Sequence, residues 1–251
     1  MPLFRFASPQ TFYPLAGRLA VIAAVVALAG AAVGLWLGLL VAPADAQQGE
    51  VYRLIYIHVP SAWMAMFTYL VMAGYAVLAL VLRARLAAMM MRALAPTGAL
   101  MAAIALWTGA IWGKPTWGTY WAWDARMTST LVLLFLYFGF IALVAAIEDP
   151  VRGDRAGAVL LLVGVINVPI IYFSVRWWNT LHQGASLTPA GSAIAPVMLR
   201  AMLIMTVAAW AYTIAASLHR VRSIILERER HTRWARELPG IGAPVPQGAR
   251  G

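Results

Sequence analysis

The residues of this sequence best suited to chemistry are two histidines and a short stretch crowded with aromatic side chains. Residues 112–126 contain five aromatic residues and end on an acidic and a basic one: Trp112, Trp117, Tyr120, Trp121, Trp123, Asp124 and Arg126. Tryptophan and tyrosine are common where membrane helices meet water, so an interfacial belt is one interpretation. Flat aromatic rings also bury large apolar areas. A binding surface for a large, flat, apolar ligand is therefore the other interpretation.

The spacing of the tryptophans favours the binding surface. Trp117 and Trp121 are four residues apart, and Trp123 follows two residues later. In a short helical turn the first two rings would lie on one face. We therefore expect a row of rings able to cover the edge of a porphyrin.

Two histidines flank this stretch in the sequence, His58 before it and His182 after it. Taken singly, each is most simply a residue hydrogen-bonded to backbone or lipid headgroups near the membrane surface. As a pair they suggest more, because imidazole is a common axial ligand of haem iron and two imidazoles complete a six-coordinate centre. His219 and His231 lie in a basic C-terminal segment, where we expect no ligand role.

The absence of cysteine narrows the chemistry further. Without cysteine the chain forms no disulfide, no Cys-ligated zinc site and no iron–sulfur centre. No cluster of carboxylates accompanies the two histidines, so zinc hydrolysis has no complete ligand set. These observations favour a haem with His58 and His182 as its axial ligands, and without cysteine the chain can form no thioether bond to it.

Membrane helices must position these residues. The chain has 251 residues, 63% of them hydrophobic and 11% charged, against about 25% charged in an ordinary soluble domain. Six apolar runs approach the roughly 20 residues that cross a bilayer as helix. We predict one all-α polytopic membrane domain with spans at 19–42, 61–82, 95–112, 128–147, 156–175 and 197–218, and a basic tail at 219–251.

Several local signals refine this arrangement. Residues 44–46, Ala-Asp-Ala, resemble a signal cleavage site, but the preceding apolar run is too long for a signal peptide, so we expect a retained helix. Apolar spacing over 51–58 predicts a short helix on the membrane surface, with His58 at its end. Asn167 and Pro169 predict a kink in the fifth span, and Asp124 or Thr128 is expected to begin the fourth helix.

The distribution of basic residues predicts the orientation. Fourteen of the nineteen Lys and Arg residues lie in the two termini and in the segments 83–92 and 148–155. The positive-inside rule then places both termini in the cytoplasm, and His58, His182 and the aromatic loop on the opposite face. The charge sits in short segments between spans, which does not fit a nucleic-acid groove. Haem propionates would need cations on the outer face, and Arg53 and Arg126 are the best placed by sequence.

Residues 117–126, Trp-Gly-Thr-Tyr-Trp-Ala-Trp-Asp-Ala-Arg, closely resemble the WGxxWxWDxR motif of the haem-handling (WWD) membrane proteins of cytochrome c biogenesis. Six spans, with one histidine before the motif and one after it, are similar to the CcmC branch of that group. The larger relatives CcmF and CcsA have more spans and more histidines.

This resemblance implies a role in the System I maturation of cytochrome c in the bacterial inner membrane. It implies that haem is held on the periplasmic face between His58 and His182 and is presented to the haem chaperone CcmE. The implied partners are CcmD and the ABC transporter subunits CcmA and CcmB. The chain has no Gly-rich loop ending in Gly-Lys-Ser/Thr, so ATP hydrolysis is expected in a partner, and we expect a delivery subunit rather than an enzyme.

Two alternatives remain open at this point. One is a transporter that moves haem through its own helix bundle, although the spans contain few polar groups to mark a path. The other is a structural subunit whose aromatic residues only anchor it at the membrane interface.

Overall fold

A computed structural model of the chain describes residues 7–182, 187–188 and 191–238. Within these residues, six helices are long and apolar enough to cross a membrane, which confirms an all-α multi-pass membrane protein. Its elements are α1 (Pro9–Trp36), η2 (Leu37–Val41), η3 (Glu50–Leu54), α2 (Ile55–Val81), α3 (Arg85–Trp117), α4 (Ala125–Ala146), α5 (Pro150–Gly164), α6 (Asn167–Trp177), β1 (Leu187–Thr188), β2 (Gly191–Ser192), α7 (Pro196–Glu229) and α8 (Arg233–Arg236).

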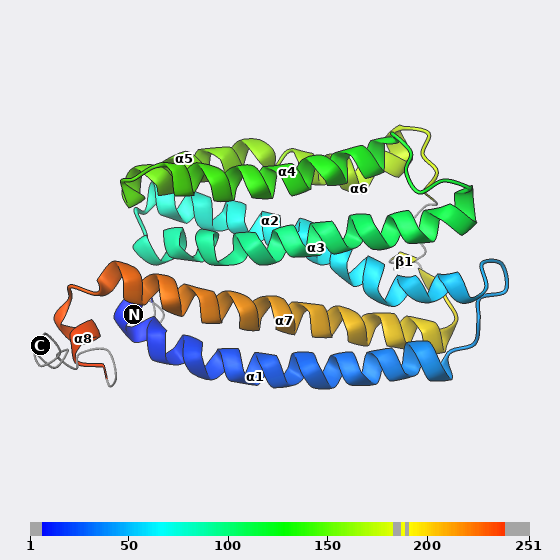
Figure 1. Ribbon diagram of the computed structural model, residues 1–251, viewed down its shortest axis with the longest axis horizontal. Helices are drawn as coiled ribbons and strands as arrows, with labels where there is room; N and C mark the ends of the chain where they lie inside the picture. The colour runs from blue at the N-terminus through cyan, green and yellow to red at the C-terminus, as the bar shows by residue number, and fades with distance from the viewer. Residues whose placement is uncertain (1–6, 183–186, 189–190, 239–251) are drawn as a thin grey trace, which may run out of the picture.

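The helices form an elongated bundle, in which α1 and α7 run side by side beneath α2 and α3, and α4, α5 and α6 lie on the other side (Figure 1). The beginning of α1 and the end of α7 lie at the same end of the bundle, with the α2–α3 and α4–α5 turns. The connections from α1 to α2 and from α3 to α4 lie at the opposite end, together with the end of α6 and the beginning of α7; we call this the loop end. His58, the aromatic stretch and His182 all belong to the loop end.

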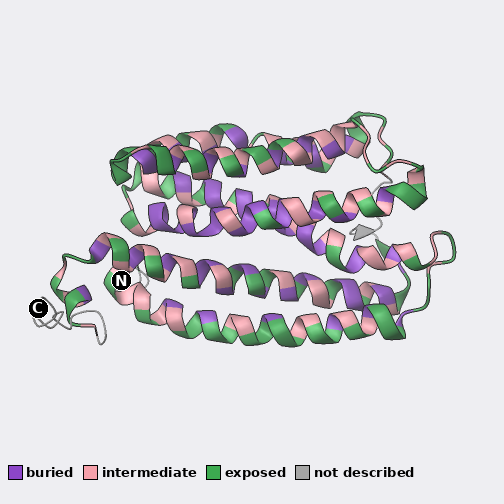
Figure 2. Ribbon diagram, in the orientation of Figure 1, coloured by how far each residue is buried: buried purple, intermediate pink, exposed green. Residues whose placement is uncertain are grey.

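Burial is concentrated in the middle of the bundle (Figure 2). Half of the apolar window of α3 and of α7 is buried, against 17% for α1, so α1 lies at the edge of the bundle. Small residues let α1 approach its neighbour closely: a Cβ added at Gly30 would lie 3.2 Å from the Cβ of Ala208. Close contact between small residues is the usual way that membrane helices associate.

Several helices extend well beyond the predicted spans. The first helix begins at Pro9 instead of 19, the third at Arg85 instead of 95, and the last ends at Glu229 instead of 218. The predicted spans were cut at the arginines, whereas arginine, like alanine, leucine and methionine, is a good helix former and allows the helix to continue beyond the apolar run. Arg92 in particular, predicted to lie in a loop, is inside α3. The second half of the basic tail, 239–251, lies outside the described residues.

The predicted surface helix over 51–58 is wrong as a separate element. The short 3₁₀ helix η3 leads directly into α2 at Ile55, and Pro60 lies inside α2 rather than at the start of a span. His58 therefore sits in the second turn of α2, within the bundle.

The predicted kink in the fifth span is confirmed. This span is divided into α5 and α6, and α6 begins at Asn167. The Asn167 amide donates a hydrogen bond to the backbone oxygen of Ser129 in α4 (2.8 Å), so its polar group faces the bundle. The break turns α6 and its C-terminal end toward the beginning of α4.

Replacing Gly98 with alanine should destabilise the bundle. A Cβ at Gly98 would overlap the ring of Tyr137, which is fully buried and donates a hydrogen bond to the backbone oxygen of Ala65 (2.7 Å). Overpacking of this kind costs about 1–3 kcal/mol. Thermal unfolding of the purified protein in detergent measures it, with Gly74→Ala as the control because nothing lies within 4 Å of that position. Equal melting temperatures for the two variants would contradict the prediction.

Candidate functional site

A cavity of about 790 Å³ opens at the loop end, within the roughly 300–1,000 Å³ typical of small-molecule and cofactor sites. Residues from α2, α3, α4, α6 and α7 line it together with the segment after α6. Four of the residues that the sequence predicted for the site line this one cavity: His58, Trp117, Arg126 and His182.

His58 is held by α3. Its Nδ1 lies 3.1 Å from the hydroxyl oxygen of Thr108, and this hydroxyl has a single proton. Thr108 donates that proton to the backbone oxygen of Ile104 (2.7 Å) in its own helix, so it accepts a hydrogen bond from His58 Nδ1–H. The lone pair of His58 is thereby placed on Nε2. The ring of Trp112 packs edge-on against this imidazole at 5.6 Å between centroids.

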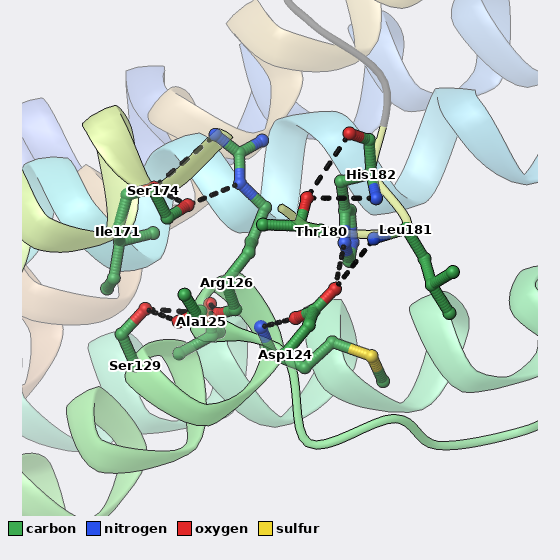
Figure 3. A network of polar contacts seen from close by, with 11 residues as sticks. Asp124, Ala125, Arg126, Ser129, Ile171, Ser174, Thr180, Leu181 and His182 are labelled. Atoms are coloured by element: carbon green, nitrogen blue, oxygen red, sulfur yellow. Dashed lines mark hydrogen bonds and ion pairs between the residues drawn. The ribbon is translucent and has the colours of Figure 1, made fainter. Parts of the chain in front are cut away.

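His182 is held by Asp124, 58 residues earlier in the chain (Figure 3). Its Nδ1 lies 3.2 Å from Asp124 Oδ2, and an ionised carboxylate only accepts, so the proton is on Nδ1 and the lone pair on Nε2. Burial lowers the pKa of His182 from its ordinary value, while Asp124 opposes the shift. A lowered pKa favours the neutral imidazole, the form that binds metal. Trp117 packs against this ring at 4.8 Å between centroids.

Asp124 joins the beginning of α4 to the segment after α6. Its Oδ1 accepts from the backbone N–H of Met127 (2.7 Å), which makes Asp124 the N-cap of α4, one of the two starts that the sequence suggested. Its Oδ2 accepts from the backbone N–H of Leu181 (3.3 Å) as well as from His182. One carboxylate therefore fixes both the helix start and the imidazole.

Arg126 points toward the C-terminal half of α6 (Figure 3). Its Nε donates to Ser174 Oγ (3.2 Å), and its Nη2 donates to the backbone oxygens of Ile171 (3.3 Å) and Tyr172 (3.2 Å). The guanidinium thus ties α4 to α6 and still lines the cavity, as does Arg176. These two side chains give the cavity a positive charge suited to an anionic ligand group.

Arg53 does not reach the cavity. It pairs with Glu50 (2.5 Å) and donates to the backbone oxygens of Gly38 (2.5 Å) and Ala42 (3.0 Å). Arg53 therefore fastens η3 to the end of η2, and it is absent from the cavity lining. Proximity in sequence to His58 was misleading, because the η3 turn directs the arginine to the α1 side.

The aromatic rings in the second half of the aromatic stretch do not line the cavity. Gly118 has φ +81° and ends α3, so the predicted helical turn that would stack Trp117 with Trp121 is wrong. Trp121 packs edge-on with Trp123 instead, at 5.4 Å between centroids. Trp123 is 78% exposed and Tyr120 59% exposed, which leaves both available at the surface of the loop end.

Sequence reasoning missed several residues of the cavity. Thr108 and Trp112 lie one helical turn apart on α3 and both contact His58. Trp112 was counted in the aromatic stretch but placed at the end of the third predicted span, and Thr108 was not singled out. Trp63, Met66 and Met202 also line the cavity and appear in sequence as ordinary span residues.

Comparisons with known proteins show the family of this chain. The family model described as Heme exporter protein C matches residues 2–236. The chain is 43% identical to Heme exporter protein C of Haemophilus influenzae over 94% of this chain and 96% of that protein. It is equally similar to Heme exporter protein C of Escherichia coli K12, at 43% identity over 94% and 96% of the two chains. A putative cytochrome c biosynthesis ccmC-like mitochondrial protein of Marchantia polymorpha is 45% identical over 67% of this chain and 71% of its own. The chain therefore belongs to the Heme exporter protein C (CcmC) family.

Proposed function

We propose that this protein binds haem b in the cavity at the loop end, with His58 and His182 as axial ligands. The observation that supports this most directly is the pair of imidazoles in one cavity, each with Nδ1 engaged by an oxygen and Nε2 left to bind iron. Hydrogen bonds to the second ring nitrogen are the usual means of orienting a metal-binding histidine. The haem is cargo, and the chain supplies binding and orientation.

The remaining residues suit the other parts of a haem. Trp112 and Trp117 each pack beside one histidine, so their rings would form apolar walls close to the iron. Arg126 and Arg176 would bind the propionates, since guanidinium pairs well with carboxylate. Because there is no cysteine, no thioether bond to a haem vinyl group can form in this chain, which suits cargo that is passed on.

The exposed half of the aromatic stretch suits delivery. Tyr120 and Trp123 project from the same loop that ends at Asp124, so a partner that contacts them lies beside the cavity. We propose that this partner is the haem chaperone CcmE, on the periplasmic side of the bacterial inner membrane. CcmD and the ABC transporter subunits CcmA and CcmB would complete the assembly and supply ATP hydrolysis.

Passage of haem through the bundle is a weaker alternative. The cavity belongs to the loop end, and at the opposite end the carboxylate of Asp154 binds both Arg92 and Arg228, which ties α3, α5 and α7 together. A haem flux assay in vesicles that contain this protein alone separates the two functions. Transport without partners would favour passage, and retention of bound haem would favour delivery.

The absorption spectrum of the purified full-length protein tests haem binding itself. After addition of haem, we expect a Soret band and the visible bands of six-coordinate, low-spin iron, because two imidazoles complete the coordination. The same protein without added haem is the reference. After removal of unbound haem, absence of a Soret band in both the oxidised and the reduced state would instead support a purely structural subunit.

A further inference from the structure

A second cavity, of about 800 Å³, lies at the end of the bundle opposite His58 and His182. The ends of α2 and α7 and the beginnings of α3 and α5 enclose it, beside the α2–α3 turn (left in Figure 1). Its apolar lining includes Leu80, Ala88 and Met89. Five guanidinium groups, from Arg83, Arg85, Arg155, Arg228 and Arg230, line it against the two carboxylates of Asp154 and Glu227.

The buried carboxylates at this end are already neutralised. Asp154 is 7% exposed and accepts from Arg92 Nε (2.6 Å) and from both terminal nitrogens of Arg228 (2.6 and 3.0 Å). Glu229, also buried, pairs with Arg85. Of the five, Arg83, Arg155 and Arg230 form no ion pair with the residues that the structure describes, and Arg230 Nε donates a hydrogen bond to His231 Nε2 (3.0 Å). The cavity therefore keeps an excess of positive charge at its rim.

The backbone at Arg83 is unusual. Its φ is +51°, and no other non-glycine residue in the described part of the chain has a positive φ. Left-handed backbone is unfavourable for a residue with a Cβ and persists where the surroundings hold it. The turn thus directs a long cationic side chain to the rim at a conformational cost that glycine would avoid.

The apolar surface beside the cavity continues along α2. Val81 and Leu82 follow Leu80 and are 72% and 65% exposed, so they offer apolar surface on the outside of the bundle. A free phosphate ion would use the arginines but leave this apolar surface unused. A lipid with an anionic headgroup would use both, and basic pockets between membrane helices are known to bind such headgroups.

We propose that this cavity binds the phosphate group of an anionic phospholipid, with Arg83 and Arg155 as its free cations and Leu80 and Val151 beside its acyl chain. The bound lipid would bridge the α2–α3 turn and the beginning of α5. The proposal rests on this end of the bundle alone and is independent of haem binding at the other end.

Native mass spectrometry of the full-length protein in a neutral detergent tests the proposal, with phosphatidylglycerol, phosphatidylcholine and inorganic phosphate as probes. We expect selective binding of phosphatidylglycerol. The double variant Arg83→Gln/Arg155→Gln should bind phosphatidylglycerol about 30-fold more weakly, because each arginine near an anionic lipid contributes about 1 kcal/mol of binding free energy. Both side chains are exposed, so the variant should keep the wild-type melting temperature.

The control is Arg152→Gln/Arg233→Gln, which removes the same charge from side chains that are 83% and 93% exposed and do not line the cavity. It should bind phosphatidylglycerol like the wild type. Equal binding of the two lipids, or equal losses in both double variants, would overturn the proposal. Displacement by an equal concentration of inorganic phosphate would identify a free-anion site, and binding of an acidic peptide but not of lipid would identify a protein-docking surface.

Discussion

Haem should be lost from the purified protein when either His58 or His182 is replaced by alanine. Each substitution removes one of the two Nε2 atoms that we propose as axial ligands and leaves its partner, Thr108 or Asp124, in place. We expect a larger effect than the roughly 10–100-fold loss of affinity typical of residues that only orient a ligand. A haem titration followed at the Soret band measures it, and the residual complex should become five-coordinate and high-spin.

The matched control is His219→Ala. His219 is an exposed residue in the C-terminal half of α7, and it does not line the cavity. Its haem affinity should equal that of the wild type. Added imidazole should restore the six-coordinate spectrum of the His58 and His182 variants by filling the space left by the ring. Unchanged haem content in both single variants would contradict axial ligation.

Some of this molecule could be predicted from the sequence because the relevant signals are local. Apolar runs of span length predict the six helices, Asn167 and Pro169 predict the break in the fifth span, and Asp124 is a typical helix N-cap. Helix ends were less predictable, because arginines continue α3 and α7 beyond the apolar core.

The candidate site was predictable only in part, because it depends on contacts between distant segments. His58 and His182 line one cavity because α2 packs near the segment after α6. No single stretch of sequence predicts that packing. Thr108 meets His58 across 50 residues and Asp124 meets His182 across 58. Gly118 shows that one local residue can also separate close neighbours in the sequence. Its left-handed backbone ends α3, so Trp117 lines the cavity and Trp121 does not.

Changing Asp124 to asparagine should weaken haem binding while the fold is kept. Asparagine is as good an N-cap as aspartate, so α4 should still begin at the same residue. In the wild type, one carboxylate oxygen of Asp124 accepts from the Met127 N–H and the other accepts from His182. An asparagine side chain has only one acceptor oxygen, so it cannot do both. If the amide oxygen caps α4, its NH₂ group faces His182 Nδ1 and favours the tautomer with the proton on Nε2, which blocks the iron-binding lone pair.

We expect this variant to lose about 10–100-fold in haem affinity, the range typical when the partner of a metal-binding histidine is removed. Asp149→Asn is the matched control, because Asp149 caps α5 by accepting from the N–H groups of Val151 and Arg152 and touches no histidine. Both variants change one N-cap carboxylate to an amide, so their melting temperatures should shift alike, whereas only Asp124→Asn should alter the Soret titration and raise the high-spin fraction. Equal haem affinities for the two variants would contradict the prediction, because they would show that Asp124 caps α4 but does not orient the imidazole of His182 for haem binding.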